Sequence, residues 1–162
     1  MARVYVSIGS NVEPERQIRS GIHALRKHFG PLSISPVYQS RAVGFAGDDF
    51  LNLVVGFDTS EEVRKVVIHL REIEATHGRG RDGPRFADRP LDLDLLLYDE
   101  LVLKETGLQI PRDEITRYAF VLCPLAELAG KRCHPVLGKT FAELWEALAE
   151  HSEPLLPIVL GL

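Results

Sequence analysis

Residues 50–78, FLNLVVGFDTSEEVRKVVIHLREIEATHG, contain the change in hydrophobic period that decides the fold. The first nine residues of this stretch are rich in β-branched and aromatic side chains bounded by turn residues, which is typical of a strand. Thr59 and Glu62 have the spacing of a capping box, and the apolar side chains after them recur at helical spacing until Gly78. The stretch therefore predicts a strand followed directly by a helix.

The same analysis predicts the elements on either side. Residues 3–8 alternate as a strand does, and an amphipathic helix follows from Pro14 to Phe29, where Gly30-Pro31 ends the pattern. Residues 33–39 and Leu91 to Tyr98 are two further strands. The resulting order βαββαβ predicts an α+β fold with a ferredoxin-like core, in which two helices cover one face of an antiparallel sheet.

The remaining sequence adds to this core. A short hairpin is expected around residues 101–110, and a helix is expected to open at Pro124. A last helix is capped by Thr140 with Glu143 and turns inward the side chains of Phe141, Leu144, Trp145 and Leu148. The apolar tail of residues 154–160 is expected to pack within the chain. Residues 1–162 are expected to form a single domain.

Composition limits the classes of function. The 162 residues carry a formal net charge of −4, which argues against bulk nucleic-acid binding. No apolar run approaches the roughly 18 residues of a membrane span, and no signal-peptide core follows Met1, so we expect a cytoplasmic protein without a membrane partner. Cys123 and Cys133 are expected to be buried structural thiols. We expect a monomer rather than an obligate oligomer.

The segment of residues 78–89, GRGRDGPRFADR, is basic within an acidic chain. It holds four arginines and two aspartates, and its glycines and proline predict a loop. One guanidinium group can donate hydrogen bonds to two oxygens of a phosphate, so these arginines could bind phosphate. A solvated basic loop is the simpler alternative.

The sequence LDLDL of residues 91–95 follows at once. On a strand, Asp92 and Asp94 project from the same face about 6.5 Å apart along the chain. An isolated pair of aspartates at this spacing more often belongs to the solvent-exposed face of a half-buried strand. Beside the arginines, however, two carboxylates are suited to Mg²⁺ that also binds substrate phosphates, so the combination predicts a magnesium–nucleotide site.

The sequence matches other common nucleotide-binding and metal-binding motifs poorly. Gly138-Lys139-Thr140 resembles the end of a phosphate-binding P-loop, but Cys133 stands where that motif needs glycine. No G-x-G-x-x-G sequence follows a strand, so a nonstandard phosphate cradle is required. Of six scattered histidines, only His69 and His77 fall in one predicted helix, eight residues apart, which gives a zinc site little support; His23 and His28 are expected on the surface.

Four features together resemble the 6-hydroxymethyl-7,8-dihydropterin pyrophosphokinases of folate biosynthesis. They are Ile8-Gly9-Ser10-Asn11, Asn52, Glu74 with the arginines after it, and Arg89-Pro90-Leu91-Asp92-Leu93-Asp94. The resemblance extends from residue 3 to about residue 145. It implies a ferredoxin-like α+β fold, in agreement with the element order.

The resemblance also implies a reaction and its residues. An intact pyrophosphoryl group would pass from ATP to the hydroxymethyl oxygen of the pterin, releasing AMP, with two Mg²⁺ bridging the triphosphate. Asp92 and Asp94 would be the metal ligands and would form the catalytic set with Arg79 and Arg89. The nucleotide would contact Glu74, Arg81, Arg85, Leu95 and Arg112. The pterin would lie between Phe50 and Phe120, with Asn52 at its polar edge and Ser40 and Val43 completing the pocket.

The chain departs from the family pattern before Phe120. Arg112 stands at a position where the family has histidine, Tyr118 stands where it has arginine, and Gly107 replaces a common nucleotide-contacting arginine. In the pterin loop, Arg41-Ala42 replaces a proline-rich pair. Two alternatives therefore stay open: a divergent paralogue acting on another heterocyclic alcohol, and a noncatalytic nucleotide-binding member of the fold.

Overall fold

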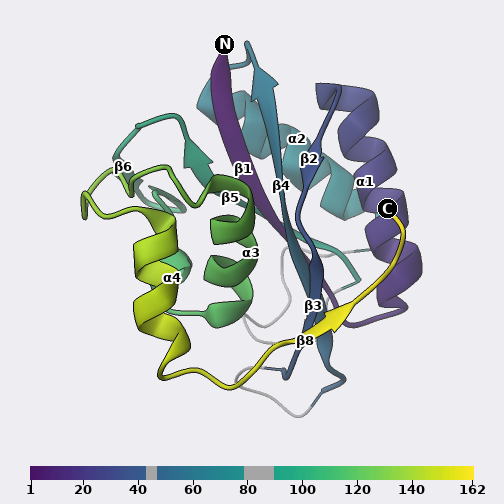
Figure 1. The fold of residues 1–162 in the computed structure, drawn as a ribbon. Helices are drawn as coiled ribbons and strands as arrows, with labels where there is room; N and C mark the ends of the chain where they lie inside the picture. The colour runs from purple at the N-terminus through teal and green to yellow at the C-terminus, as the bar shows by residue number, and fades with distance from the viewer. Residues whose placement is uncertain (43–46, 79–89) are drawn as a thin grey trace.

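The computed structural model describes residues 1–42, 47–78 and 90–162 (Figure 1). The first half of the chain contains β1 (Ala2–Ser10), α1 (Pro14–Phe29), β2 (Ser33–Ile34), β3 (Val37–Ser40), β4 (Phe50–Thr59) and α2 (Val63–Thr76). The second half contains β5 (Asp92–Tyr98), β6 (Leu103–Glu105), β7 (Leu108–Ile110), the 3₁₀ helix η1 (Asp113–Thr116), α3 (Ala119–Ala129), α4 (Phe141–Ala149) and β8 (Leu156–Ile158).

The main sheet is antiparallel and has the strand order β5-β1-β4-β3-β8, with β2 also paired to β4. This order confirms the ferredoxin-like core. The strand expected over residues 33–39 is divided into β2 and β3. Proline has no N–H for the ladder, and at Ser35-Pro36 the Ser35 hydroxyl accepts a hydrogen bond from Val54 N instead, at 2.9 Å.

Helices cover both faces of the sheet (Figure 1). α1 and α2 pack on one face around Ile18, Leu25 and Val66, as the helical spacing predicts. α3 and α4 pack on the other face around Leu122 and Phe141, which are at most 1% exposed. The βαββαβ pattern predicts only the first layer, because its two helices are the crossovers of the core.

Two predicted helix starts are wrong. α2 begins after Glu62, whose side chain accepts a hydrogen bond from Arg64 N at 3.0 Å, while Thr59 remains in β4 opposite Ala2. The predicted capping box therefore does not form. α3 begins at Ala119 and holds Pro124 in its interior. The residues around Pro124 are buried against the sheet, so packing outweighs the hydrogen bond that a helical proline loses.

The predicted start of α4 is confirmed. Thr140 Oγ1 accepts a hydrogen bond from Glu143 N at 3.1 Å, and the Glu143 carboxylate accepts one from Thr140 N at 3.1 Å. We expect Thr140→Ala to lower the free energy of unfolding in urea by about 1 kcal/mol, since the N–H of Glu143 loses its acceptor. Thr106→Ala, in the exposed β6–β7 turn, is the control and should change it by less than about 0.5 kcal/mol.

The apolar tail packs within the chain, as expected, by adding β8 to the sheet beside β3. Both cysteines are free. Cys123 is buried, and burial raises the pKa of its thiol to about 11. Cys133 is exposed, so its predicted burial is wrong; it forms an isolated bridge with Thr140 at the surface. Among the described residues, no helix combines the length and the hydropathy needed to span a bilayer.

Candidate active site

β1 brings the two halves of the predicted site together. Gly9 is the register partner of Asn52 on β4 and of Asp92 on β5. Residues opposite one another on neighbouring strands share a face, and strands lie about 4.8 Å apart, so the backbones of Asn52 and Asp92 are about 10 Å apart. The predicted pterin residue and the predicted metal ligand therefore lie on one face of the sheet.

Gly9 leaves the space that these side chains use. A Cβ atom at this position would lie 3.3 Å from Asn52 Oδ1 and 3.7 Å from Phe50 Cδ1. A larger residue at this position would therefore push against both predicted substrate contacts.

Three of the predicted substrate residues come together on β3 and β4. Asn52 is 8% exposed and donates from Nδ2 to Ser40 Oγ at 2.7 Å, and Ser40 is the register partner of Phe50. Phe120 lies in the first turn of α3, where its ring stacks on Tyr118 with centroids 5.0 Å apart. Val43 lies outside the described residues.

The acidic half of the site is partly neutralised by arginines. Asp94 is 9% exposed, and its Oδ1 lies 3.5 Å from Arg112 Nη2 and 3.8 Å from Arg71 Nη2. Burial opposes the charge of Arg112, but Asp94 and Glu114 outweigh it and hold the pKa of Arg112 above its ordinary value. Arg112 Nε is buried and donates to no hydrogen bond with the described residues. A cationic group with one free donor therefore faces this carboxylate.

Glu74 and Arg71 hold the edge strand that carries the aspartates. Glu74, which is 3% exposed, accepts a hydrogen bond from Leu93 N at 2.8 Å, and Arg71 donates to Leu93 O at 3.1 Å. The two side chains also pair with each other at 2.5 Å. Within the described residues β5 pairs only with β1, so these two side chains take the place of a second partner strand at Leu93, between Asp92 and Asp94.

Arg71 is a site residue that the sequence analysis missed. Its only local signal is its spacing of three residues from Glu74 on a helix, which permits an ion pair. Leu95 lies in the apolar core between the sheet and α1 and α2, so its side chain is not brought to the acidic site. Arg79, Arg81, Arg85 and Arg89 lie outside the described residues.

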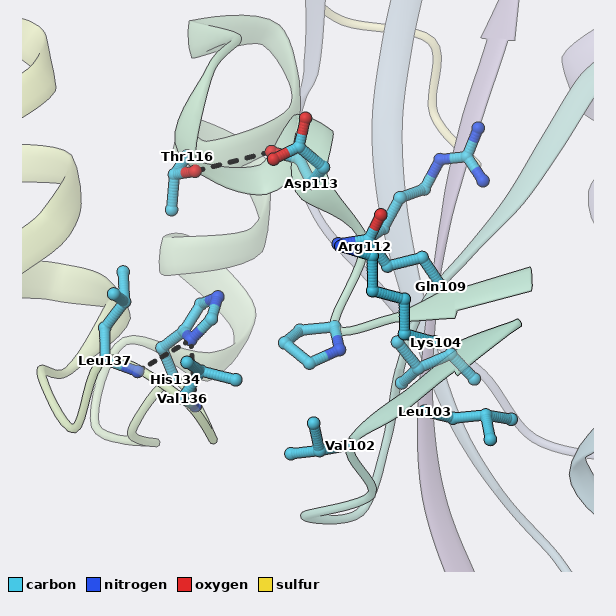
Figure 2. A pocket seen from close by; sticks show the side chains of 12 residues that line it. Val102, Leu103, Lys104, Gln109, Arg112, Asp113, Thr116, His134, Val136 and Leu137 are labelled. Carbon is cyan, nitrogen blue, oxygen red and sulfur yellow. Dashed lines mark hydrogen bonds between the residues drawn. The ribbon is translucent and has the colours of Figure 1, made fainter. Parts of the chain in front are cut away.

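A small pocket flanks the site beyond Arg112 (Figure 2). Its volume is about 270 Å³, and it lies between the β6–β7 hairpin, the segment from Pro111 to Thr116, and the loop of His134. The Arg112 side chain extends away from His134 and pairs with Asp94 and Glu114. The pocket includes neither Asp92 nor Asp94, and is smaller than most ligand pockets.

His134 lines this pocket and is held by hydrogen bonds to its own loop. Its Nδ1 accepts hydrogen bonds from Val136 N and Leu137 N, each at 3.2 Å, and burial lowers its pKa. The lowered pKa means that His134 contributes stability above the unfolded value of about 6.5 and that this stability is lost as the pH falls through the folded value. We expect the free energy of unfolding to fall less between pH 7 and pH 5 in His134→Asn than in the wild type. The exposed His23→Asn should keep the wild-type slope.

Comparison with known proteins shows the family of this chain. Residues 5–130 match the family model of 7,8-dihydro-6-hydroxymethylpterin-pyrophosphokinase. A 2-amino-4-hydroxy-6-hydroxymethyldihydropteridine pyrophosphokinase of Pseudomonas aeruginosa is 39% identical over 78% of this chain and 80% of its own length. One from Aquifex aeolicus is 31% identical over 88% of this chain and 90% of its own length.

The fold is also that of a solved structure. The wild-type HPPK-DHPS of Plasmodium falciparum superposes with a TM-score of 0.76 over 93% of this chain, at 11% sequence identity. This chain spans 45% of that longer one, and the likeness concerns the fold alone. The match of the family model over most of the chain, together with the two bacterial relatives, places the protein in the 7,8-dihydro-6-hydroxymethylpterin-pyrophosphokinase family.

Proposed function

We propose that the chain transfers pyrophosphate from ATP to the hydroxyl of 6-hydroxymethyl-7,8-dihydropterin and releases AMP, at the face where Asn52 and Asp92 flank Gly9. As a member of its family, the chain is a pyrophosphokinase of folate biosynthesis. The observation that carries the site assignment is the register of β1, which joins the pterin residues to the carboxylates.

The residues at the acidic end fit Mg²⁺. Asp92 and Asp94 offer hard carboxylate oxygens from one face of β5, and these are the ligands that Mg²⁺ takes together with substrate phosphates. When bound, two such ions would neutralise charge on the triphosphate. We propose that the Arg112 guanidinium, whose Nη2 is 3.5 Å from Asp94, also binds a phosphate oxygen, and Arg79, Arg81, Arg85 and Arg89 are proposed for the same purpose from the sequence.

The residues at the other end fit a flat heterocycle. After donating to Ser40, the Asn52 amide keeps one N–H donor and its carbonyl acceptor, which suits the alternating donors and acceptors of a pterin edge. Phe50 and Phe120 are partly buried aromatic rings on β4 and α3, and we propose that they stack on the two faces of the pterin.

The proposed step forms one bond and breaks one. The pterin hydroxyl oxygen bonds to the β-phosphorus of ATP, the bond from that phosphorus to the α–β bridging oxygen breaks, and the hydroxyl proton is released. Such a transfer depends mainly on positioning and charge neutralisation. The strand register positions the acceptor, while the carboxylates and arginines bind the donor.

Product analysis tests the proposal. Purified protein with Mg–ATP and the pterin should form AMP and pterin diphosphate in equal amounts. Formation of ADP would instead indicate transfer of a single phosphoryl group and would contradict the proposal. Tight binding of Mg–ATP without turnover of this pterin would favour the two alternatives, a different heterocyclic alcohol or a noncatalytic role.

Asn52→Ala is expected to lower kcat/KM for the pterin by about 10- to 100-fold, because a buried hydrogen-bonding edge of the substrate loses its partner. The KM for ATP should stay within about twofold of the wild type. Gln39→Ala is the matched control: Gln39 is the register partner of Leu51 and so lies on the other face of the sheet. An equal loss in both variants would argue against direct pterin recognition by Asn52.

A further inference from the structure

Two histidines and a glutamate meet at the end of the sheet far from the proposed active site. His28 lies in the last turn of α1, Glu61 between β4 and α2, and His69 in α2. Each offers one ligand atom, and the three atoms lie within 4.8 Å of one another. Because Thr59 is seven residues along β4 from Asn52, this cluster is about 23 Å from the pterin residues.

The Glu61 carboxylate contacts both imidazoles, whose ring centroids lie 3.9 Å apart. His28 Nε2 is 2.8 Å from Glu61 Oε1, and His69 Nε2 is 3.2 Å from Glu61 Oε2. In a tetrahedral zinc site with bonds of about 2.05 Å, neighbouring ligand atoms are about 3.3 Å apart. The two nitrogen–oxygen spacings are therefore close to those between zinc ligands, and the two imidazole rings, whose centroids are 3.9 Å apart, would turn apart to face one ion.

The outer contacts orient these ligands. His69 Nδ1 lies 3.3 Å from Glu72 Oε2, so a proton on Nδ1 leaves the Nε2 lone pair facing Glu61. A carboxylate behind the ring is the usual support of a metal-bound histidine. The main chain of Glu61 is held by Thr59 Oγ1, which accepts from its N–H, and by the Tyr98 hydroxyl, which donates to its carbonyl.

One atom of the cluster lacks a partner. Glu61 Oε2 is buried and forms no hydrogen bond with the described residues, although it faces His69 Nε2. With the His69 proton on Nδ1, two lone pairs oppose each other across 3.2 Å, an arrangement that a cation between them would stabilise. This place therefore suits a cation, which is either a proton on His69 Nε2 or a metal ion.

We propose that His28, Glu61 and His69 bind one Zn²⁺. Two imidazole nitrogens and one carboxylate oxygen suit zinc, whereas Mg²⁺ requires oxygen ligands, so the two metals are expected at opposite ends of the sheet. The ligand side chains are between 26% and 35% exposed, which leaves solvent access to a further coordination position. The sequence gives zinc little support because the ligands come from three separate segments.

Competition with a chromogenic chelator tests the site directly. The full chain, stripped of metal and kept in millimolar Mg²⁺, should take up one equivalent of Zn²⁺. His28→Ala and His69→Ala should each weaken the affinity by about tenfold or more, and Glu72→Gln by about tenfold. His23→Ala, exposed on the same helix as His28, and Asp94→Asn, in the acidic site, should retain it. Circular dichroism checks that each variant is folded.

Replacing Zn²⁺ with Co²⁺ gives a second, spectroscopic test of the site. We expect a visible absorption band of four- or five-coordinate Co²⁺ in the wild type and its loss in His69→Ala. Absence of bound Zn²⁺ in the wild type, unchanged affinity in folded His28→Ala and His69→Ala, or loss of the zinc in Asp94→Asn alone would each overturn the proposal.

Discussion

Asp94→Asn is expected to lower pyrophosphoryl transfer by about 10³-fold, which is the largest effect predicted for this protein. The substitution keeps the shape of a side chain that is 9% exposed but removes the negative charge proposed to bind Mg²⁺. It also removes one of the two carboxylates that pair with Arg112, whose Nη2 is 3.5 Å from Asp94 Oδ1. Initial rates of AMP formation at saturating Mg–ATP and pterin measure the effect.

Glu100→Gln is the matched control for this prediction. Glu100 is exposed just beyond the other end of β5, so removing its charge should change the rate by less than about twofold. A melting temperature close to that of the wild type would show that Asp94→Asn is folded. Unchanged turnover in folded Asp94→Asn would remove the basis for placing the metal at β5.

Glu74→Ala is expected to lower the free energy of unfolding by about 3–5 kcal/mol, as measured by urea denaturation. The substitution takes the acceptor from Leu93 N and leaves Arg71 without its buried partner, because Glu74 Oε1 is 2.5 Å from Arg71 Nη1. The loss would be a large part of the 5–15 kcal/mol that stabilises a typical domain. Turnover should also fall, because this pair fixes the strand segment between the two aspartates.

Two further variants separate the causes. Glu72→Ala, on the same helix but 67% exposed, should change the stability of the metal-free protein by less than about 0.5 kcal/mol. The double variant of Arg71→Ala with Glu74→Ala should be less destabilised than the sum of the single variants, because no buried Glu74 carboxylate is then left without Arg71. Additive losses would instead mean that Glu74 and Arg71 stabilise the protein independently.

The hydrogen bonds of Glu74 and Arg71 to Leu93 explain how the proposed site can lie on an edge strand. An edge strand has unpaired N–H and C=O groups on one side and is free to fray or to pair with other chains. Here two helical side chains satisfy one N–H and one carbonyl at the point where the carboxylates stand. Stability and catalysis are therefore expected to depend on the same contacts.

Much of the fold could be predicted from the sequence because it depends on neighbouring residues. Alternation of side chains predicted β1 and β5, and apolar residues at helical spacing predicted α1 and α2. The spacing of Thr140 and Glu143 predicted the start of α4. The same alternation placed Asp92 and Asp94 on one face. Where long-range packing opposed a local preference, the predictions were wrong, as at Pro124, which lies inside α3 because its neighbours are buried on the sheet.

Only the tertiary structure decided which distant residues meet. The register of β1 against both β4 and β5 set Asn52 beside Asp92, and α2 brought Arg71 to the edge of β5. His28 and Glu61 are 33 residues apart, yet their side chains lie within 2.8 Å. Periodicity describes which face of its own element a side chain occupies, whereas the packing of whole elements determines what that face contacts, and this packing depends on the complete core.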